Sequence, residues 1–131
     1  MSFLLDTNVV SEIARVRPNA GVLAWASRIT IHAISVVTIE EIRYGLAANP
    51  SARIEGFMNA FFAGETCYPI TPDIALRAGT LRGSFQRQGI IRNQADMFIA
   101  ATAQAHNLTL VTRNTRDFEG CGIALLNPFS E

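Results

Sequence analysis

Hydrophobic and polar positions divide this chain into short apolar runs and longer amphipathic stretches. The short runs are bounded by polar or turn residues, as is typical of buried strands, and they fall at 2–5, 29–35, 66–70, 109–112 and 123–126. The longer stretches have helical spacing and fall at 8–15, 20–27, 37–48, 52–62, 72–88 and 94–106. Strands that alternate with helices usually form a parallel sheet covered by those helices. We therefore predict an α/β fold with a mainly parallel sheet of about five strands flanked by helices.

The size and hydropathy of the chain indicate one compact domain. Its 131 residues are 49% hydrophobic, which suits a single domain spanning 1–131 with a sizeable core. No apolar stretch approaches the roughly 20 residues of a membrane helix. The start, MSFLLDTN, also lacks the basic segment of a signal peptide. We expect a cytoplasmic protein without a membrane partner.

The types of charged residue and the positions of the cysteines exclude several kinds of active site and metal site. The formal net charge is zero, so no global field attracts nucleic acid, but every basic residue is arginine, which binds phosphate well and leaves local RNA contact open. The lack of lysine excludes a Schiff base and a P-loop lysine. Cys67 and Cys121 are far apart, and His32 and His106 are isolated. A structural zinc site is therefore not expected, and the cysteines are expected to be buried free thiols.

Asp6 directly follows the apolar run Phe3-Leu4-Leu5, at the end of a predicted buried strand. A carboxylate in this position needs a partner, because burying an unpaired charge costs several kcal/mol or more. The carboxyl ends of parallel strands are also where ligands bind in α/β sheets. Alternatively, Asp6 caps the helix predicted at 8–15, and the two roles are compatible.

Glu41 lies at the start of the helix predicted at 37–48, and two settings are open for it. Thr38 and Glu41 fit a capping box, in which the glutamate folds back onto the helix start. If Ser35 is the cap instead, Glu41 lies inside the helix. Gly45 is then one turn further along the same face and leaves room beside the carboxylate.

Asp96 lies near the start of the helix predicted at 94–106. Its helix face is otherwise apolar, with Ile99, Ala100 and Ala103 at helical spacing, so an acid there is costly unless something compensates it. The alternative is an acid that the helix dipole favours, with Asn93 as the cap.

Asp117 lies in the polar loop 113–122, directly after a predicted strand. It is either a functional acid or a surface acid paired with Arg113 or Arg116, and Asn114 offers a neutral oxygen ligand in the same loop. The remaining acids are expected to be surface charges or caps: Glu12, Glu55, Glu65, Asp73, Glu119 and Glu131.

Four acids at strand ends and helix starts would meet at one edge of a parallel sheet. Two carboxylates about 4 Å apart repel each other by about 4 kcal/mol at an effective dielectric constant of about 20. A cluster of them therefore calls for a cation, and hard oxygen ligands suit Mg²⁺ or Mn²⁺, which also bind phosphate. We predict a metal site that is formed by Asp6, Glu41, Asp96 and Asp117.

Four segments resemble the PIN-domain ribonucleases, and closely the VapC toxins of bacterial toxin–antitoxin pairs, including the FitB-like branch. They are LLDTNVVSE at 4–12, TIEEIRYG at 38–45, ADMFIAATA at 95–103 and LVTRNTRDFEGCGIALLNPF at 110–129. The segments follow the order and spacing of the family over nearly the whole chain. The resemblance implies a parallel sheet flanked by helices, in agreement with the hydrophobic pattern.

The resemblance implies that Asp6, Glu41 and Asp96 are the core catalytic and metal-binding acids. The place of the fourth acid varies within the family's loop, and here Asn114 occupies its first candidate position and Asp117 its second. The residues that match supporting polar positions are Thr7, Asn8 and Thr112.

The implied activity is metal-dependent hydrolysis of RNA by an endoribonuclease that acts as a toxin. Water is the nucleophile, and three arginines are candidates to hold flanking phosphates: Arg92, Arg113 and Arg116. The resemblance also implies homodimers and an antitoxin that carries a DNA-binding domain and inserts a segment into the active-site groove. The apolar stretch Phe57–Phe62 packs either in such an interface or in the core.

Three other readings compete. A receiver-type phosphoacceptor domain usually needs an acidic pair after its first strand and a later lysine, but this chain has the single Asp6 there and no lysine. A haloacid-dehalogenase-like phosphatase needs a second acid two residues after the first, where this chain has Asn8. A PIN-like module that binds without catalysis is disfavoured because the three core acids are present.

Overall fold

The computed structural model describes residues 2–131 and confirms the α/β fold. The strands are β1 (Phe3–Leu5), β2 (Ala33–Ser35), β3 (Thr66–Tyr68), β4 (Thr109–Val111) and β5 (Leu125–Leu126). The helices are α1 (Thr7–Ile13), α2 (Ala20–Arg28), α3 (Val36–Ala48), α4 (Ala52–Ala63), α5 (Pro72–Arg87) and α6 (Gln94–His106), with the 3₁₀ turn η1 (Thr115–Phe118) between the last two strands. None of the helices in this described part is long and apolar enough to cross a membrane.

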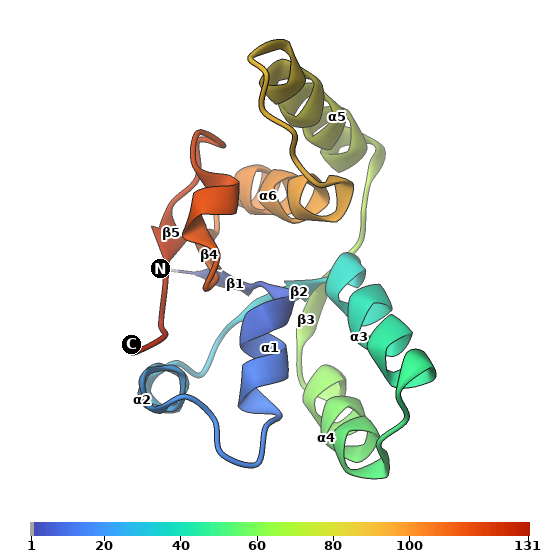
Figure 1. The fold of residues 1–131 in the computed structure, drawn as a ribbon, viewed down its shortest axis with the longest axis vertical. Coiled ribbons are helices and arrows are strands. Elements are labelled where there is room, and N and C mark those ends of the chain that lie inside the picture. The colour runs from blue at the N-terminus through green and yellow to red at the C-terminus, as the bar shows by residue number, and fades with distance from the viewer. Residues whose placement is uncertain (1) are drawn as a thin grey trace.

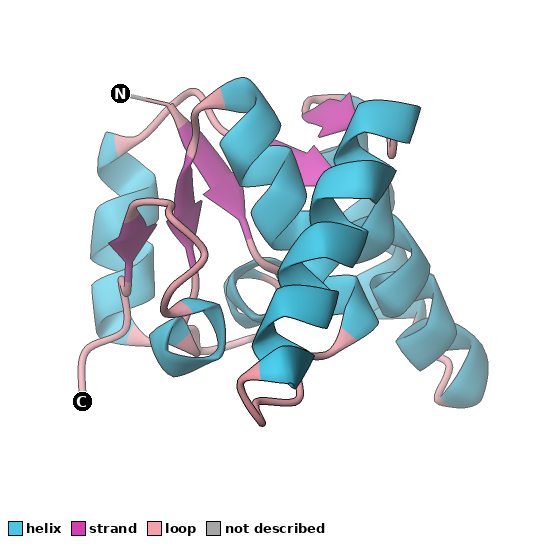
Figure 2. Cartoon of the chain, turned by 90° about the horizontal axis from the view of Figure 1, so that it is seen from above, coloured by secondary structure: helices cyan, strands magenta, loops and turns pink. Residues whose placement is uncertain are grey.

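The strands form one sheet in the order β3-β2-β1-β4-β5, and every neighbouring pair is parallel. β1 therefore lies in the middle, between β2 and β4 (Figures 1 and 2). Because all five strands run in the same direction, the carboxyl ends of these three neighbours lie side by side. Residues that follow them in the sequence are brought to one edge of the sheet.

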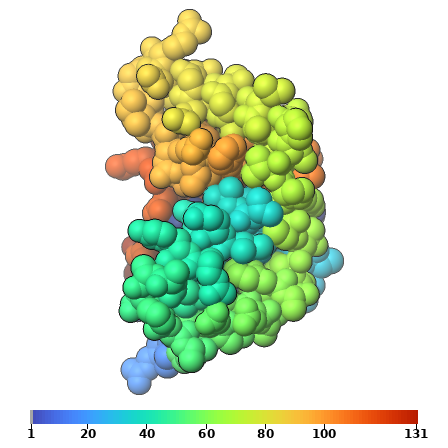
Figure 3. Space-filling view, turned by 90° about the vertical axis from the view of Figure 1, so that its right-hand side faces the viewer, coloured from blue at the N-terminus to red at the C-terminus, as the bar shows by residue number. Residues whose placement is uncertain are grey.

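Helices cover both faces of the sheet, α5 and α6 on one side and α1 to α4 on the other (Figure 1). Alternate strand residues point to opposite faces, and β1 divides its side chains accordingly. Leu4 packs in the core beneath α5 and α6, whereas Phe3 and Leu5 pack in the core with α1 to α4. The edge view in Figure 3 shows α3 against α6, so the two layers also meet beyond the sheet. Burial on both faces explains why the strands are almost wholly apolar.

The second strand is shorter than predicted. Ile29 and Ile31 alternate as in a strand, but they lie outside β2, and the side chain of Ile31 is 79% exposed. In the observed register Ala33 pairs with Leu4 on one side and with Thr66 on the other, near the first residues of both neighbouring strands. The residues before Ala33 therefore extend beyond the ends of β1 and β3, where few backbone groups are available for strand pairing.

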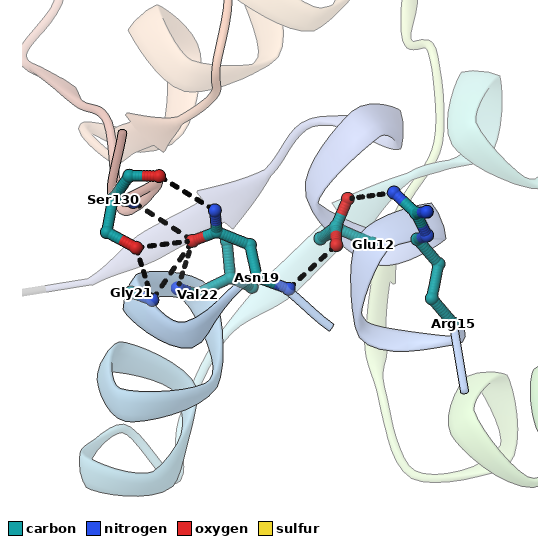
Figure 4. A network of polar contacts seen from close by, with 6 residues as sticks. All are labelled: Glu12, Arg15, Asn19, Gly21, Val22 and Ser130. Atoms are coloured by element: carbon teal, nitrogen blue, oxygen red, sulfur yellow. Dashed lines mark hydrogen bonds and ion pairs between the residues drawn. The ribbon is translucent and has the colours of Figure 1, made fainter. Parts of the chain in front are cut away.

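Two acids that were expected at the surface are buried instead. Glu12 is 8% exposed and accepts hydrogen bonds from the Arg15 guanidinium and from the Asn19 backbone N–H, at 3.4 and 2.8 Å (Figure 4). The side chain of Glu65 is 8% exposed and lies 2.7 Å from Nδ1 of His32. Both predictions were wrong: the Arg15 contact of Glu12 is local, but the bond from Asn19, seven residues away, and the contact between Glu65 and His32, 33 residues apart, depend on packing that local sequence does not show.

Candidate active site

Asp6 continues β1 and begins α1. Its N–H donates to the Val111 carbonyl at 2.9 Å, and its Oδ1 accepts from the N–H of Thr7 at 2.8 Å, so it is the predicted helix cap. Its Oδ2 accepts from Oγ1 of Thr112 at 2.8 Å and from Nδ2 of Asn8 at 3.2 Å. The carboxylate is thus held by groups from the ends of two adjacent strands.

The pKa of Asp6 is raised above its ordinary value, mainly because burial disfavours the charged form. Hydrogen bonds from Thr112, Thr7 and Asn8 lower it, whereas the nearby charge of Glu41 raises it further. Only 5% of the residue is exposed. The hydrogen bonds therefore compensate part of the cost of burial, and the remainder favours a proton or a cation.

Thr112 and Asn8 also hold the loop that follows β4. Oγ1 of Thr112 accepts from the backbone N–H of Asn114 at 3.0 Å, and Oδ1 of Asn8 accepts from the backbone N–H of Arg113 at 3.2 Å. The start of this loop is thereby fastened to α1 beside Asp6. Asn114 takes part through its backbone, and its side chain is exposed.

Glu41 lies inside α3, because the helix is capped by Ser35, whose Oγ accepts from the N–H of Val37 at 3.0 Å. The capping box with Thr38 is therefore not formed. Oε1 of Glu41 instead accepts from Oγ1 of Thr7 at 2.6 Å. This bond joins the start of α1 to α3 and brings the second acid next to the first.

Thr38 is a supporting residue that the sequence analysis treated only as a cap. It is fully buried, and its Oγ1 lies 3.0 Å from Oγ1 of Thr7. The single hydroxyl hydrogen of Thr7 goes to Glu41, so Thr38 is the donor in this contact. The signal that could have identified it is its spacing: Thr38 precedes Glu41 by three residues and shares its helix face.

Asp96 lies in the first turn of α6, and Asn93 caps this helix by accepting from the N–H of Asp96 at 3.1 Å. The pKa of Asp96 is raised to about 6, mainly by burial and further by the negative charges of Asp6, Asp117 and Glu41, whereas the charge of Arg92 lowers it. Asp96 is therefore near enough to each of the other three acids to feel its charge.

Asp117 lies on η1, with its side chain exposed to solvent. The carbonyls of this turn are held by Arg92, whose guanidinium donates to those of Arg116, Asp117 and Glu119, at 3.5 Å for the first and 3.0 Å for the last. The guanidinium also lies 4.3 Å from the centre of the Phe85 ring. Arg92 was predicted to contact phosphate, but these contacts favour a role in holding the turn that carries the fourth acid.

Arg113 and Arg116 are exposed in the same loop, as a phosphate contact requires. The Arg113 guanidinium lies 4.8 Å from the centre of the Phe129 ring. Their predicted role in phosphate binding stays a prediction.

The carboxylates of Asp6, Glu41, Asp96 and Asp117 suit a hard divalent cation, but they do not form a complete set of metal ligands. Within residues 2–131, no three carboxylate, imidazole or thiol groups are already arranged to hold an ion. The four carboxylates repel one another, so they are not expected to come together without a cation. Mg²⁺ commonly takes only one or two carboxylates and keeps several waters, so oxygen donors that are near but not clustered fit it.

Comparison with known proteins finds relatives that match almost the whole chain. Residues 3–120 match the family model described as PIN domain. The VapC ribonuclease Y4jK of Sinorhizobium fredii is 36% identical, over 96% of this chain and 96% of its own. Toxin FitB of Neisseria gonorrhoeae is 33% identical, over 98% of this chain and 99% of its own. The crystal structure of FitAcB from Neisseria gonorrhoeae covers 96% of this chain and 97% of its own, with a TM-score of 0.82 and 32% identity.

Proposed function

Because the chain belongs to the PIN domain family, we propose that it is a toxin-type endoribonuclease that hydrolyses RNA phosphodiester bonds with a divalent cation, Mg²⁺ or Mn²⁺. The resemblance carried by the four sequence motifs is confirmed. Relatives named as ribonucleases and as a toxin, which match almost the whole chain, support the activity. The observation that carries the proposal is the convergence of the acids: Thr7 links Asp6 to Glu41 through two hydrogen bonds, and the charges of Asp6, Glu41 and Asp117 all act on Asp96.

Asp6, Glu41 and Asp96 are the proposed ligands of the ion, with Asp117 assisting through water. When bound, such a cation neutralises charge on a phosphate and lowers the pKa of a water molecule to near neutrality. The residues around the acids fix their orientation: Thr112 and Asn8 hold Oδ2 of Asp6. Thr7 holds Oε1 of Glu41, so that Oε2 can bind the cation.

The fourth acid is proposed to be Asp117 rather than Asn114. The backbone N–H of Asn114 is bound to Thr112, and its side chain is a weaker ligand than a carboxylate. The charge of Asp117 acts on Asp96, which supports its place beside the ion. Arg92 positions the turn, and Arg113 and Arg116 are the proposed contacts of flanking phosphates.

An antitoxin and a second copy of the chain are the proposed protein partners. Solved structures similar to this chain include a FitAB complex bound to a DNA fragment and a DNA-bound VapBC complex from Salmonella typhimurium. These complexes support a DNA-binding antitoxin. Within the stretch Phe57–Phe62, Met58 is 3% exposed, which indicates that the stretch packs mainly in the core. Its three partly buried phenylalanines stay candidates for an interface.

The test is cleavage of single-stranded RNA by the purified protein, with Mg²⁺ or with EDTA. Wild type should cleave only with the metal, and Asp6→Asn and Asp96→Asn should each lose at least a hundredfold in rate. Asp73→Asn is the matched control, because Asp73 is a first-turn acid of α5 outside the site. Full cleavage by both site variants would overturn the assignment. Absence of cleavage together with absence of an Asp6-dependent Mg²⁺ site in calorimetry would favour a non-catalytic binding module.

A further inference from the structure

A groove between α1, α3 and α4 begins at two residues of the proposed site and leads away from it. Its cavity of about 260 Å³ is lined at the near end by Thr7 and Glu41. Further along, the lining is apolar and includes Ile42, Leu46 and Met58. Thr7 and Glu41 therefore belong both to the proposed site and to the lining of the groove.

The far end of the groove is positively charged. Arg15 and Arg53 line the groove and also line a second, open hollow of about 400 Å³, together with Val16 and Arg17. The two hollows therefore share Arg15 and Arg53, and Arg17 adds a third arginine to the second hollow.

Contacts within the chain hold two of these arginines in place. Nη1 of Arg53 donates to the Ala14 carbonyl at 2.8 Å, and buried Glu12 accepts from Nη1 of Arg15 at 3.4 Å (Figure 4). Each guanidinium has five N–H donors, so most of them stay available. Glu12 is the one carboxylate in these contacts, so its single negative charge neutralises only one of the three positive charges of the arginines. This end of the groove therefore favours an anion.

The two charged ends are too far apart for one phosphate. α1 runs from Thr7 to Ile13, which is about 9 Å at a rise of about 1.5 Å per residue, and Arg15 lies beyond its carboxyl end. An anion at the arginines is thus a different group from the one held by the acids and their cation. Between the two ends lies an apolar floor.

We propose that this groove binds a nucleotide of single-stranded RNA next to the cleaved bond, which deepens the proposed function and rests on it. The base packs on Ile42, Leu46 and Met58, and a neighbouring phosphate binds Arg15 and Arg53. An RNA strand presents an anion, an apolar ring face and a further anion in sequence, which matches the order of surfaces along the groove. A protein segment is the other class of occupant, and the experiment below distinguishes the two.

Gly45 allows the groove to be filled without damage to the fold. It lies on α3, lines the groove, and a Cβ built on it meets no atom within 4 Å. Gly45→Leu also improves helix propensity, so the protein should not lose stability. Gly56→Leu is the matched control, because Gly56 lies on α4 in open space and outside the groove lining.

The first measurement is steady-state cleavage of a labelled single-stranded RNA of mixed sequence. Gly45→Leu should lower kcat/KM at least tenfold, while Mg²⁺ affinity in calorimetry stays within twofold of wild type and Gly56→Leu behaves as wild type. If wild type cleaves and Gly45→Leu cleaves equally well, the groove proposal is overturned. If wild type itself does not cleave, the proposed function fails instead, so the two failures are distinguishable.

The second measurement is the salt dependence of RNA binding. Each phosphate contact contributes about 0.7 to the slope of log affinity against log salt for a single strand. The double variant Arg15→Gln/Arg53→Gln should reduce this slope by about 0.7, whereas Arg87→Gln, on the exposed surface of α5, should not change it. An unchanged slope together with loss of binding to a co-expressed DNA-binding partner would assign the groove to a protein and overturn the proposal.

Discussion

Replacing Asp96 by asparagine should stabilise the metal-free protein at neutral pH while abolishing RNA cleavage. The reason is that Asp96 is a half-buried carboxylate near three other negative charges, with a pKa of about 6 compared with an ordinary value of 3.8. An amide of the same shape removes the charge and leaves the Asn93 cap, which bonds the backbone of residue 96.

The size of the gain follows from the shift in pKa. A shift of about two pKa units corresponds to about 3 kcal/mol, because each unit is worth about 1.4 kcal/mol. Asp96 is partly exposed, so solvent screening reduces this to about 1 to 2 kcal/mol. Loss of an acid near the start of α6 costs about 0.3 to 1 kcal/mol through the helix dipole. We therefore expect a net gain of about 0.5 to 1.5 kcal/mol, or about 2 to 5 °C in Tm.

The gain should depend on pH in a defined direction. The folded-state pKa of Asp96 lies above its unfolded value, so the folded protein binds this proton more tightly. The cost of the charge is absent below about pH 4 and develops as the pH rises through about 6. Wild type should thus lose stability over this interval relative to Asp96→Asn, and the two proteins should be nearly equal near pH 4.

The assay is urea unfolding with EDTA at pH 4.5 and pH 7.5, repeated at pH 7.5 with Mg²⁺. Asp73→Asn is the control, since Asp73 is also a first-turn acid but pairs with Arg77 at 2.9 Å, and it should lose stability slightly at pH 7.5. Mg²⁺ should stabilise wild type and leave Asp96→Asn unchanged, so that the order reverses. A variant that is less stable than wild type at pH 7.5 in EDTA would refute the reasoning.

Three further predictions concern parts of the molecule that support the site. Gly21→Ala should lower the free energy of unfolding by about 1 to 3 kcal/mol, because its Cβ would lie 2.5 Å from backbone atoms of the carboxyl-terminal segment. Gly83→Ala, in open space on α5, should raise it by a few tenths of a kcal/mol. Equal Tm values for the two variants would contradict this prediction. His32→Ala should cost about 2 kcal/mol because it leaves the buried carboxylate of Glu65 without its hydrogen bond, and calorimetry should find a smaller loss for Glu65→Gln. Arg92→Gln should weaken Mg²⁺ binding several-fold and speed amide hydrogen exchange in η1, and exchange as slow as in wild type would argue against a positioning role.

Local patterns in the sequence were sufficient for the secondary structure and for the order of the acids. The short apolar runs and helical spacings identified each strand and helix, because burial on both faces of a parallel sheet makes the strands nearly continuous in hydrophobicity. Asp6 was recognisable as an acid at a strand end, and Asn93 as a helix cap. These features depend on neighbours within a few residues along the chain, which sequence spacing reveals directly.

Contacts between distant segments were decided only by the tertiary structure. Thr7 binds Glu41 across 34 positions of sequence, and this bond, rather than a capping box, sets the place of the second acid. Arg92 holds the carbonyls of a turn that begins more than twenty residues later, which no local pattern indicates.

The same limit applies to charge and burial. Glu12 and Glu65 looked like surface acids because their partners lie in other elements or turns, and only packing excludes water from them. The position of each acid along the chain, and the element that carries it, were thus readable from spacing. Which donors meet each carboxylate, and how strongly burial and neighbouring charges favour a proton or a cation on Asp96, depend on how the sheet and its two helical layers pack together in space.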